Sequence, residues 1–574
     1  MSYTGELFLN PREGLLDGKI CVNNATGERR PRFLLNAALN IKHVRDATGR
    51  TLEYDGDYDG RMVGEAREYI VLSADSTDKH TTFCVEYRGA VPVFESHTAT
   101  DDWKGRIVAT AGTLRAAEQT RWYPTLFDSV TARVQEVGSF DLIVRCPTCR
   151  AIYVNGAKPV RDTVGHFVSD IPRALLLFAG DIPVLEASAV TLVGASASPA
   201  TVDVLGRGIA DIATYFARLL NRPYRERPVL LSFFSVAQRY PPGSVNWQFV
   251  TWPTIAIAGG APFDQLIEGI THSAVLVPWL RAALAHEMAH YYFGTLRMPT
   301  GPLFWFGLES TAEYLALKQV RAAEGESAYA ERALNYLGAI GYAAYPSLST
   351  ITQPEQIGLT HRYRVLPLAL MELEQRVGEA AMMRMLRTLV DAPPHEVFDL
   401  AAVRRAANDA GIHDDLLEAV IDPSALRSRV LATGHAVLVS EVKAQRDAQA
   451  VTVATLLVNH DTSSAGRLQV LQALREVSRR SPTLPRALYQ IGKIGALTGE
   501  ALNDADRALR RYLSLPIEPG QPSYADAHWR RGMIAERRNR LADAREEYGK
   551  ALQLSPQHAG ARAALTQLET RPRR

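Results

Sequence analysis

The stretch VPWLRAALAHEMAHYYFG, residues 277–294, carries two histidines four residues apart in otherwise apolar surroundings. On a helix, residues i and i+4 lie on one face, so His286 and His290 would point in the same direction. Two imidazoles on one face can bind one Zn²⁺ ion, and Glu287 then lies beside the metal as a general base. A buried helix carries such polar groups only when they have partners. The pattern therefore predicts a helix that holds one catalytic zinc ion.

The third zinc ligand has to come from elsewhere in the chain, because a catalytic zinc ion takes three protein ligands and keeps one position open. Eighteen residues separate His290 from Glu309, which lies near the start of the next helical stretch. Glu313 follows one turn later on the same face. One of these carboxylates could bind the metal while the other orients a ligand histidine. The spacing alone leaves the choice between them open.

The composition indicates a globular protein of several domains. The chain has 574 residues, of which 47% are hydrophobic and 22% are charged, and its formal net charge is +2. Such a small net charge gives no field that selects nucleic acid or a membrane surface as a partner. No run of eighteen apolar residues occurs, and the N-terminus lacks the basic and apolar regions of an export signal. We therefore expect no nucleic acid, no membrane and a cytoplasmic location.

The pattern of the chain changes at three places, which we take as domain boundaries. Residues 1–200 show short β-branched and aromatic runs between Gly, Asp, Asn and Pro turns, and this predicts an all-β domain. Residues 201–395 are mainly helical, with a strand-like piece at 228–234, and form the expected catalytic domain. Residues 396–445 follow as a helical connector. Residues 446–574 are helical and rich in Ala, Arg and Leu.

An internal repeat occurs in this last segment. The stretch 527–556 has the offsets of a tetratricopeptide repeat, namely Gly532, Ala544, Tyr548, Ala551 and Pro556. A weaker copy at 487–516 carries Gly492, Ala505 and Tyr512. The stretch 465–482 fits half a unit. Two or three such units would stack. The stack either offers a groove for a peptide or protein partner or braces the catalytic domain.

The four cysteines, Cys21, Cys84, Cys146 and Cys149, are too few to form a disulfide scaffold in a chain of this length. Cys146 and Cys149 stand in a Cys-Pro-Thr-Cys sequence. This could be half of a zinc site, a redox pair or a turn at the end of a strand. No second pair of this spacing exists to complete a four-cysteine site, so we favour the turn.

The spacing His286-Glu287-x-x-His290, eighteen residues, Glu309 resembles the gluzincin peptidases. In detail it is similar to the aminopeptidase N-like family, which also includes leukotriene hydrolases. Gly294 and Leu296 fit that family's pattern after the second histidine, and Glu309 and Ala312 match its segment around the third ligand. The resemblance implies that Glu309 is the third zinc ligand. It leaves Glu313 as the carboxylate that orients a ligand.

The resemblance also implies a catalytic tyrosine about sixty residues further on. The stretch HRYRVLPLALMELEQRVGE, residues 361–379, has Tyr363 and a Gly-Glu pair at the family's distance. The Lys-Gly-Ala sequence that usually follows the tyrosine is replaced here. Tyr363 is therefore our candidate for the residue that donates a hydrogen bond to the oxyanion. Tyr342 and Tyr345 are reserves.

Aminopeptidases of this family carry a Gly-Ala-Met-Glu-Asn sequence on an edge strand, and its glutamate binds the α-amine of the substrate. The matching stretch here is VNWQFVTWPTIAIAGG, residues 245–260. The glutamate position falls on Val250 and the asparagine position on Thr251, just before Trp252. These three residues are our candidates for substrate binding. The strand could hold an extended peptide through its backbone.

No glutamate occurs between residues 241 and 263, so the usual amine anchor is missing. An amine without a carboxylate partner loses a charge-assisted hydrogen bond. Glu118, Asp264 or Glu268 could replace the anchor.

The resemblance covers about residues 1–440, including the stretch WYPTLFD at 122–128, which is similar to the family's Phe-Pro-x-x-Asp segment.

We expect a multidomain α+β protein with three parts. They are an N-terminal β-sandwich or saddle domain, a thermolysin-like and mainly helical catalytic domain, and a C-terminal α-helical repeat domain. The expected function is zinc-dependent hydrolysis of peptide bonds in a peptide or protein substrate. Two alternatives stay open: an inactive peptidase-like scaffold that works through its repeats, and a hydrolase of a non-peptide substrate such as an epoxide. The sequence does not decide between exopeptidase and endopeptidase action.

Overall fold

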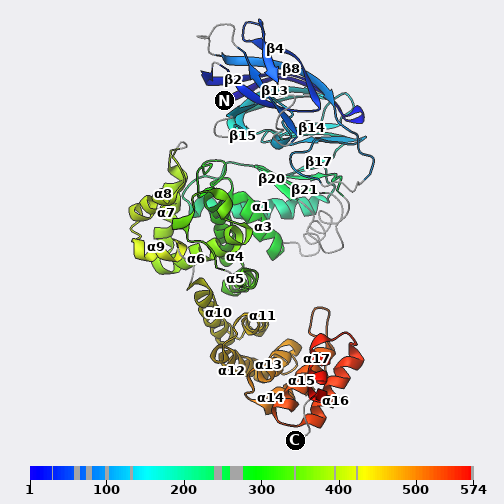
Figure 1. Cartoon of the computed structure of the whole chain (residues 1–574), viewed down its shortest axis with the longest axis vertical. Helices are drawn as coiled ribbons and strands as arrows, with labels where there is room; N and C mark the ends of the chain where they lie inside the picture. The colour runs from blue at the N-terminus through cyan, green and yellow to red at the C-terminus, as the bar shows by residue number, and fades with distance from the viewer. Residues whose placement is uncertain are drawn as a thin grey trace. The chain divides into compact units, whose positions relative to one another are not determined.

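The computed structural model shows a chain of two compact units, Met1–Met298 and Pro299–Arg574 (Figure 1). The residues that it describes are 1–28, 30–56, 65–72, 80–96, 102–128, 133–237, 248–258, 276–341, 344–393, 396–421 and 425–570.

The first unit begins with strands. Their bounds are β1 (Ser2–Asn10), β2 (Leu15–Glu28), β3 (Arg32–Asn36), β4 (Leu39–Asp46), β5 (Thr51–Leu52), β6 (Tyr54–Gly56), β7 (Ala66–Val71), β8 (His80–Ala90), β9 (Val108–Ala109), β10 (Thr113–Ala116), β11 (Thr125–Asp128), β12 (Arg133–Val134), β13 (Val137–Arg145), β14 (Ala151–Val154), β15 (Val164–Ala174), β16 (Leu177–Gly180), β17 (Val184–Glu186) and β18 (Thr191–Val193). Two short 3-10 turns, η1 (Pro11–Glu13) and η2 (Glu118–Thr120), interrupt them.

These strands form layered sheets because apolar and polar residues alternate along them. In β13, for example, Phe140, Leu142 and Val144 are buried while their neighbours face outward. Among the described residues, one sheet has the order β15-β13-β1-β2-β8-β4-β5, and two others have the orders β12-β11-β3-β7-β6 and β14-β16-β10-β9. Their inward side chains share one hydrophobic core. The predicted β-rich N-terminal region is confirmed.

A fourth sheet follows in the same unit and has a mixed order, β17-β18-β19-β21-β20. Its later strands are β19 (Val229–Phe233), β20 (Gln248–Thr251) and β21 (Thr254–Ala258), and β20 is an edge strand antiparallel to β21. The predicted strand-like piece at 228–234 is thus confirmed. A second core joins this sheet to the sheet of β14 and β16, through residues such as Tyr153, Phe178 and Leu231.

Among the described residues, the first unit also contains the helices α1 (Pro199–Leu219) and α3 (Pro278–Ala289), which pack against each other. The Ser198 hydroxyl accepts a hydrogen bond from the backbone N–H of Thr201 and caps α1, and Pro199 occupies its first turn. Pro278 likewise occupies the first turn of α3. Proline favours this position because the first N–H groups of a helix have no partner inside it.

Both cysteine pairs form disulfides in the structure. Cys21 and Cys84 lie opposite each other in the ladder of β2 and β8, and they are bonded across 63 residues of sequence. Cys146 and Cys149 are bonded within the turn between β13 and β14. The turn is confirmed. The sequence indicated only that four cysteines make no disulfide scaffold, and it did not predict the bond between Cys21 and Cys84, because strand register brings together side chains that sequence separates.

The second unit is helical. Its elements are η3 (Phe306–Ser310), α4 (Thr311–Glu324), α5 (Glu326–Ile340), η4 (Leu348–Thr350), η5 (Pro354–Gln356), η6 (His361–Val365), α6 (Leu366–Val377), α7 (Glu379–Asp391), α8 (Leu400–Asp409), α9 (Asp414–Ile421), α10 (Leu426–Lys443), α11 (Asp447–His460), α12 (Ser464–Arg480), α13 (Pro485–Thr498), α14 (Leu502–Tyr512), α15 (Tyr524–Arg537), α16 (Leu541–Leu554) and α17 (Ala559–Thr570).

From α10 to α17 each helix packs on the next one along the chain, as a stack of repeats requires (Figure 1). Gly532 of α15 lies against Tyr548 of α16, and a Cβ at this glycine would come within 2.3 Å of the ring. Gly492 lies against Leu509 in the same way. The small residues of the predicted repeats therefore do let two helices approach closely. None of the helices in the described ranges is both long and apolar enough to cross a membrane.

Candidate metal centre

Helix α3 brings the two histidines to a buried position. Leu280, Leu284 and Met288 of α3 are buried in the first unit, and His286 and His290 are each only 8% exposed. Beyond His290 the hydroxyl groups of Tyr291 and Tyr292 donate hydrogen bonds to the backbone carbonyls of Pro223 and Arg222. The end of α3 is thereby tied to the segment that follows α1.

The two imidazole rings lie side by side. Their centroids are 5.1 Å apart and their planes are nearly perpendicular. Nδ1 of His290 lies 3.2 Å from the carbonyl oxygen of Phe293. Since a carbonyl only accepts hydrogen bonds, Nδ1 carries a hydrogen, and in the neutral imidazole Nε2 then keeps its lone pair. This is the tautomer that a metal ligand needs, and fixing it through the other nitrogen is the usual device at metal sites.

Glu287 lies beside Nε2 of His290. Its carboxylate oxygen Oε2 is 3.9 Å from Nε2 of His290. The distance is too long for a hydrogen bond between the two groups. The side chain of Glu287 is mostly buried, which strengthens its electrostatic interactions.

Glu309 and Tyr363 both lie in π-helical turns, η3 and η6. Such turns insert one extra residue into a helix and occur frequently at functional sites. The two turns pack against each other. The hydroxyl of Ser310 donates a 2.8 Å hydrogen bond to the backbone carbonyl of Arg362, so the residues next to Glu309 and Tyr363 are joined directly.

The helices that continue these two turns are also locked together. Lys318 of α4 is 4% exposed and pairs with Glu374 of α6 at 2.6 Å. Tyr314 of α4 donates a second hydrogen bond to Glu374, and Glu379 at the start of α7 pairs with the same lysine. A buried ion pair with several further bonds holds its helices in one arrangement. It therefore fixes the positions of η3 and η6 relative to each other.

One group of three side chains among the described residues could hold a metal ion, and it consists of His286, His290 and Glu309. Each offers one ligand atom, and these atoms all lie within 4.8 Å of one another. Two imidazole nitrogens and one carboxylate oxygen form a donor set that suits Zn²⁺. These are the three residues that we expected as ligands.

Glu313, the residue expected to orient a ligand, is 4% exposed on α4. Its carboxylate accepts a hydrogen bond from the hydroxyl of Tyr336, and Oε1 lies 3.6 Å from Nη2 of Arg332. These contacts attach the first turn of α4 to α5. The orienting role of Glu313 stays a prediction.

Two of the three candidate tyrosines lie among the described residues. Tyr363 is half-buried, and its backbone carbonyl accepts a 2.8 Å hydrogen bond from the guanidinium of Arg364. The hydroxyl of Tyr345 donates a hydrogen bond to the carbonyl of Ile340, so this group is already engaged in local structure. Tyr342 lies outside the described residues.

The expected substrate strand is β20, at the edge of its sheet. Thr251 is buried and its hydroxyl donates a 2.9 Å hydrogen bond to Oε2 of Glu118. Val250 is half-buried, and its carbonyl accepts a 2.7 Å hydrogen bond from Lys104. Trp252 is half-buried, and its carbonyl accepts one from the amide of Asn155.

Among the three carboxylates considered as replacement anchors, Glu118 lies next to this strand. Its own negative charge is already paired with Lys104, and the residue is 3% exposed. Because Lys104 already neutralises this negative charge, the carboxylate attracts a substrate amine only weakly. Asp264 and Glu268 lie outside the described residues. Lys104 was not predicted as part of this region, because no motif in the sequence around residue 104 indicates its pairing with Glu118.

Comparison with solved structures shows the fold to which this chain is similar. Leukotriene A4 hydrolase from Saccharomyces cerevisiae matches with a TM-score of 0.53 and 13% identity, over 99% of this chain and 92% of that one. An M1 zinc metallopeptidase from Deinococcus radiodurans matches with a TM-score of 0.51 and 14% identity, over 73% and 92%. A mutant of the latter, bound to a Tyr-Ser-Ala substrate, matches equally well, with a TM-score of 0.51 and 14% identity over 74% and 93%.

These likenesses confirm the expected α+β fold with its β-rich N-terminal part and helical C-terminal part. A tetratricopeptide repeat family model matches residues 525–558, which comprise α15 and α16. The repeat predicted at 527–556 is thus confirmed. No curated protein matches the sequence.

Proposed function

We propose that this chain is a zinc-dependent peptidase that holds one Zn²⁺ ion with His286, His290 and Glu309. The strongest support is the convergence of their three ligand atoms within 4.8 Å. The hydrogen bond from His290 to the Phe293 carbonyl adds to it, because it leaves Nε2 as a ligand. The similarity of the fold to zinc metallopeptidases is consistent with this assignment.

Zn²⁺, when bound, supplies Lewis-acid chemistry by lowering the pKa of a water molecule and polarising a carbonyl group. Glu287 takes the proton from the attacking water at Oε2 and later delivers it to the leaving amine. The Tyr363 hydroxyl donates a hydrogen bond to the oxygen that becomes negative in the transition state. Val250, Thr251 and Trp252 hold the substrate as an additional strand through the backbone of β20.

The substrate class that we propose is a peptide or protein, and the related Deinococcus peptidase was solved with a tripeptide substrate. No glutamate occurs between residues 241 and 263, and the charge of Glu118 beside β20 is already paired with Lys104, so neither place supplies a carboxylate anchor for a free α-amine. We therefore expect peptides with a blocked N-terminus to be cleaved as well as free ones. Strict dependence on a free amine would instead mean that the anchor lies elsewhere.

The helical repeats are proposed to contact a protein partner, as repeat stacks of this type do.

The disulfides count against the cytoplasmic location that we expected from the sequence. Two disulfides are present, and disulfides persist mainly in oxidising compartments. Thiol alkylation of the protein isolated from its own cells, with and without prior reduction, measures which state the cysteines hold there.

The decisive experiment combines metal analysis with one substitution. Purified protein should contain one zinc ion per chain. The variant Glu287→Gln should keep that ion and lower kcat by about 10²–10⁴-fold on a peptide substrate, because a general base contributes that much. Plasma mass spectrometry and a fluorogenic peptide library measure the two quantities.

Glu331→Gln is the matched control, since Glu331 is exposed on α5 and makes the same change of charge. It should leave both zinc content and kcat unchanged. If Glu287→Gln stays as active as this control, the peptidase assignment is wrong. Full zinc content without any peptide turnover in the unsubstituted chain would favour the scaffold alternative or a non-peptide substrate.

A further inference from the structure

The middle of helix α10 is apolar on more than one side. Residues 430–440 contain no Asp, Glu, Lys or Arg. Val437 and Leu438 are buried, and α10 packs against α5 and α11. Ala432 and Ala436 are nevertheless exposed, and so is Val439 at 37%. A helix that is apolar on several faces is normally covered on all of them.

These exposed residues line an open hollow of about 810 Å³ between α10 and α12. Leu431 completes the apolar part of the lining, and His435, Asp461 and Gln469 supply polar groups. Small-molecule sites commonly combine a mainly apolar wall with a few polar groups at fixed places, in volumes of roughly 300–1,000 Å³. The hollow has this composition and size.

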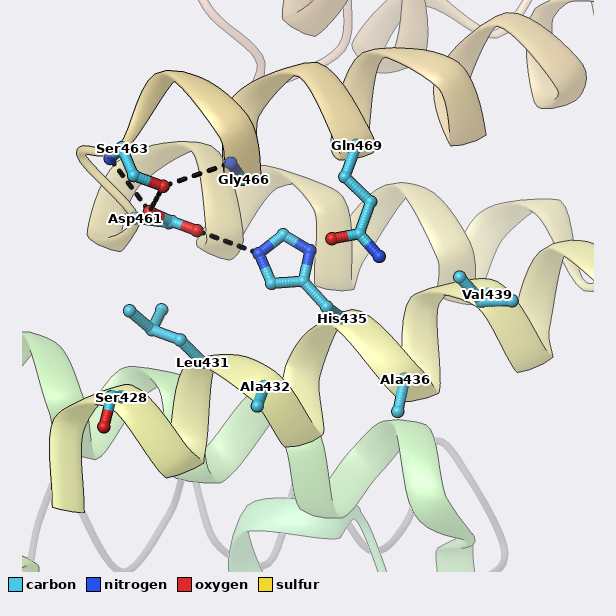
Figure 2. Close-up of a pocket in the computed structure, with 10 residues that line it drawn as sticks. All are labelled: Ser428, Leu431, Ala432, His435, Ala436, Val439, Asp461, Ser463, Gly466 and Gln469. Atoms are coloured by element: carbon cyan, nitrogen blue, oxygen red, sulfur yellow. Dashed lines mark hydrogen bonds and ion pairs between the residues drawn. The ribbon is translucent and has the colours of Figure 1, made fainter. Parts of the chain in front are cut away.

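His435 and Asp461 form a buried pair in this hollow (Figure 2). They are 9% and 7% exposed, and Nε2 of His435 lies 2.9 Å from Oδ2 of Asp461. The other carboxylate oxygen accepts hydrogen bonds from the backbone N–H and the hydroxyl of Ser463. Burial raises the pKa of the Asp461 carboxyl, but these hydrogen bonds outweigh it and hold the pKa below its usual value.

A glycine makes room for this pair. Gly466 lies in the first turn of α12, and a Cβ there would come within 1.7 Å of Oδ2 of Asp461. Any other residue would push the carboxylate away from His435. Glycine destabilises a helix, and at this position it leaves the space that the Asp461 carboxylate needs in order to reach His435. The hydrogen-bonded pair is therefore a built feature of the fold.

The second nitrogen of His435 has nothing to bond with. Nδ1 is buried and has no hydrogen-bond partner among the described residues. Figure 2 shows the imidazole between Asp461 and Gln469, with this nitrogen on the side of Gln469. Because the Asp461 carboxylate accepts at Nε2, a neutral imidazole carries its hydrogen there and presents a lone pair at Nδ1. A buried acceptor without a donor is unfavourable.

We propose that the hollow between α10 and α12 binds an apolar group that carries one N–H or O–H donor, with the donor bonded to Nδ1 of His435. Leu431, Ala432, Ala436 and Val439 contact the apolar body of the ligand. Asp461 and Gly466 hold the imidazole in the accepting tautomer. An indole or a phenol has this chemistry. The site uses none of the residues proposed to bind zinc or to act on the substrate.

Two small probes test the donor directly, namely indole and 1-methylindole. They have nearly the same apolar body, but only indole has an N–H group. Equilibrium dialysis of the full chain against each probe measures both dissociation constants. Indole should bind about fivefold to tenfold more tightly than 1-methylindole, because one hydrogen bond to a buried acceptor contributes that much. Equal affinities, or no binding of indole at millimolar concentration, would overturn the proposal.

Two substitutions locate the binding. In His435→Phe the preference for indole over 1-methylindole should disappear, since phenylalanine keeps a ring without an acceptor. In Ala436→Trp both probes should be lost, because the new side chain fills the hollow. This residue is exposed, so the variant should fold. Ser440→Ala, on the exposed surface of the same helix, should bind like the unsubstituted chain. A preference for indole that survives in His435→Phe would contradict the assignment.

The zinc site is tested separately. Glu287→Gln should bind indole as the unsubstituted chain does, so a failure of the peptidase proposal does not affect this result. Conversely, His435→Phe should keep its zinc and its kcat. A variant of His435 that lost zinc would show that the hollow is no independent site.

Discussion

His290 of α3 and His435 of α10 are both buried histidines in which one ring nitrogen is fixed by an acceptor from the same chain. In His290 the backbone carbonyl of Phe293 fixes Nδ1, and Nε2 remains. In His435 the carboxylate of Asp461 fixes Nε2, and Nδ1 remains. The local device is the same in both. What differs is the group of atoms that the remaining nitrogen meets.

His290 offers one atom to a set of convergent ligand atoms that also includes one from His286 and one from Glu309. The remaining nitrogen of His435 lies in a hollow whose lining is mostly apolar. Several convergent ligand atoms suit a metal ion. A single hydrogen-bond acceptor in apolar surroundings instead suits an organic group that carries one hydrogen-bond donor. A fixed tautomer therefore prepares a histidine for binding, and its surroundings select what is bound.

The largest expected effect separates the two histidines by their zinc dependence. His290→Ala should lose the bound zinc and lower kcat/KM by more than about 10³-fold, because the metal and its general base act as a unit. His435→Ala should keep both. Zinc content and peptide turnover, measured on the two purified variants, check this. Equal losses in both variants would remove the distinction between the two sites.

The next effect concerns Tyr363, which we propose as the hydrogen-bond donor to the oxyanion. Tyr363→Phe should lower kcat by about 10²-fold or more and leave KM near its original value, since a donor to the oxyanion acts mainly in the transition state. Steady-state kinetics on the same peptide substrate measure both constants. Tyr345→Phe is the control, because the Tyr345 hydroxyl already donates to Ile340. A larger loss in the control would transfer the role to Tyr345.

A third buried histidine, His361, sharpens the comparison because neither of its nitrogens has a partner among the described residues. It is 2% exposed, and burial lowers its pKa from about 6.5 to about 4. Between these two pH values the unfolded chain binds a proton that the folded chain does not. The free energy of unfolding should therefore fall as the pH drops from 6.5 towards 4, by at most about 3 kcal/mol.

Urea unfolding of the metal-free protein at pH 7 and at pH 4.5 measures this loss. Metal-free protein is needed because acid also releases metal ions from histidines. His361→Phe keeps the ring that packs on Tyr345 and should lose less stability between these pH values than the original chain does. If both proteins lose the same amount, His361 is not the group that titrates.

The smallest expected effect tests how the carboxylate reaches His435. Gly466→Ala should destabilise the fold by about 2 kcal/mol, because Asp461 must move and give up its hydrogen bonds. Gly549→Ala is the matched change in α16, where a Cβ meets nothing within 4 Å. It should instead stabilise the helix by about 0.5–1 kcal/mol. Thermal or urea unfolding of both variants measures the change in the free energy of unfolding. A change of the same sign in both variants would contradict the argument.

The fold could be read from the sequence where local periodicity decides it. The strands around Phe140, Leu142 and Val144 follow from alternation, and the α15–α16 pair follows from Gly532 and its partners at fixed offsets. The disulfide between Cys21 and Cys84 could not be read in this way. It depends on the register of β2 on β8, which is set by the whole sheet.

The candidate site was predictable in part, for the same reason. The positions of His286, Glu287 and His290 on one helix follow from helix geometry alone. The π-helical turns around Glu309 and Tyr363 were not predicted, because one extra residue in a helical turn leaves no mark in the pattern of apolar residues. The pairing of Glu118 with Lys104 was equally invisible.

The sequence by itself determined which side chains share a face, a turn or a repeat, since these relations depend only on the geometry of a single element. It therefore named the two histidines, the glutamate proposed as general base and the small residues of the repeats. The tertiary structure alone decided which distant groups meet: Glu309 with the histidines, Asp461 with His435, and Thr251 with Glu118. Such meetings depend on how whole elements pack, and many residues outside the site contribute to that packing.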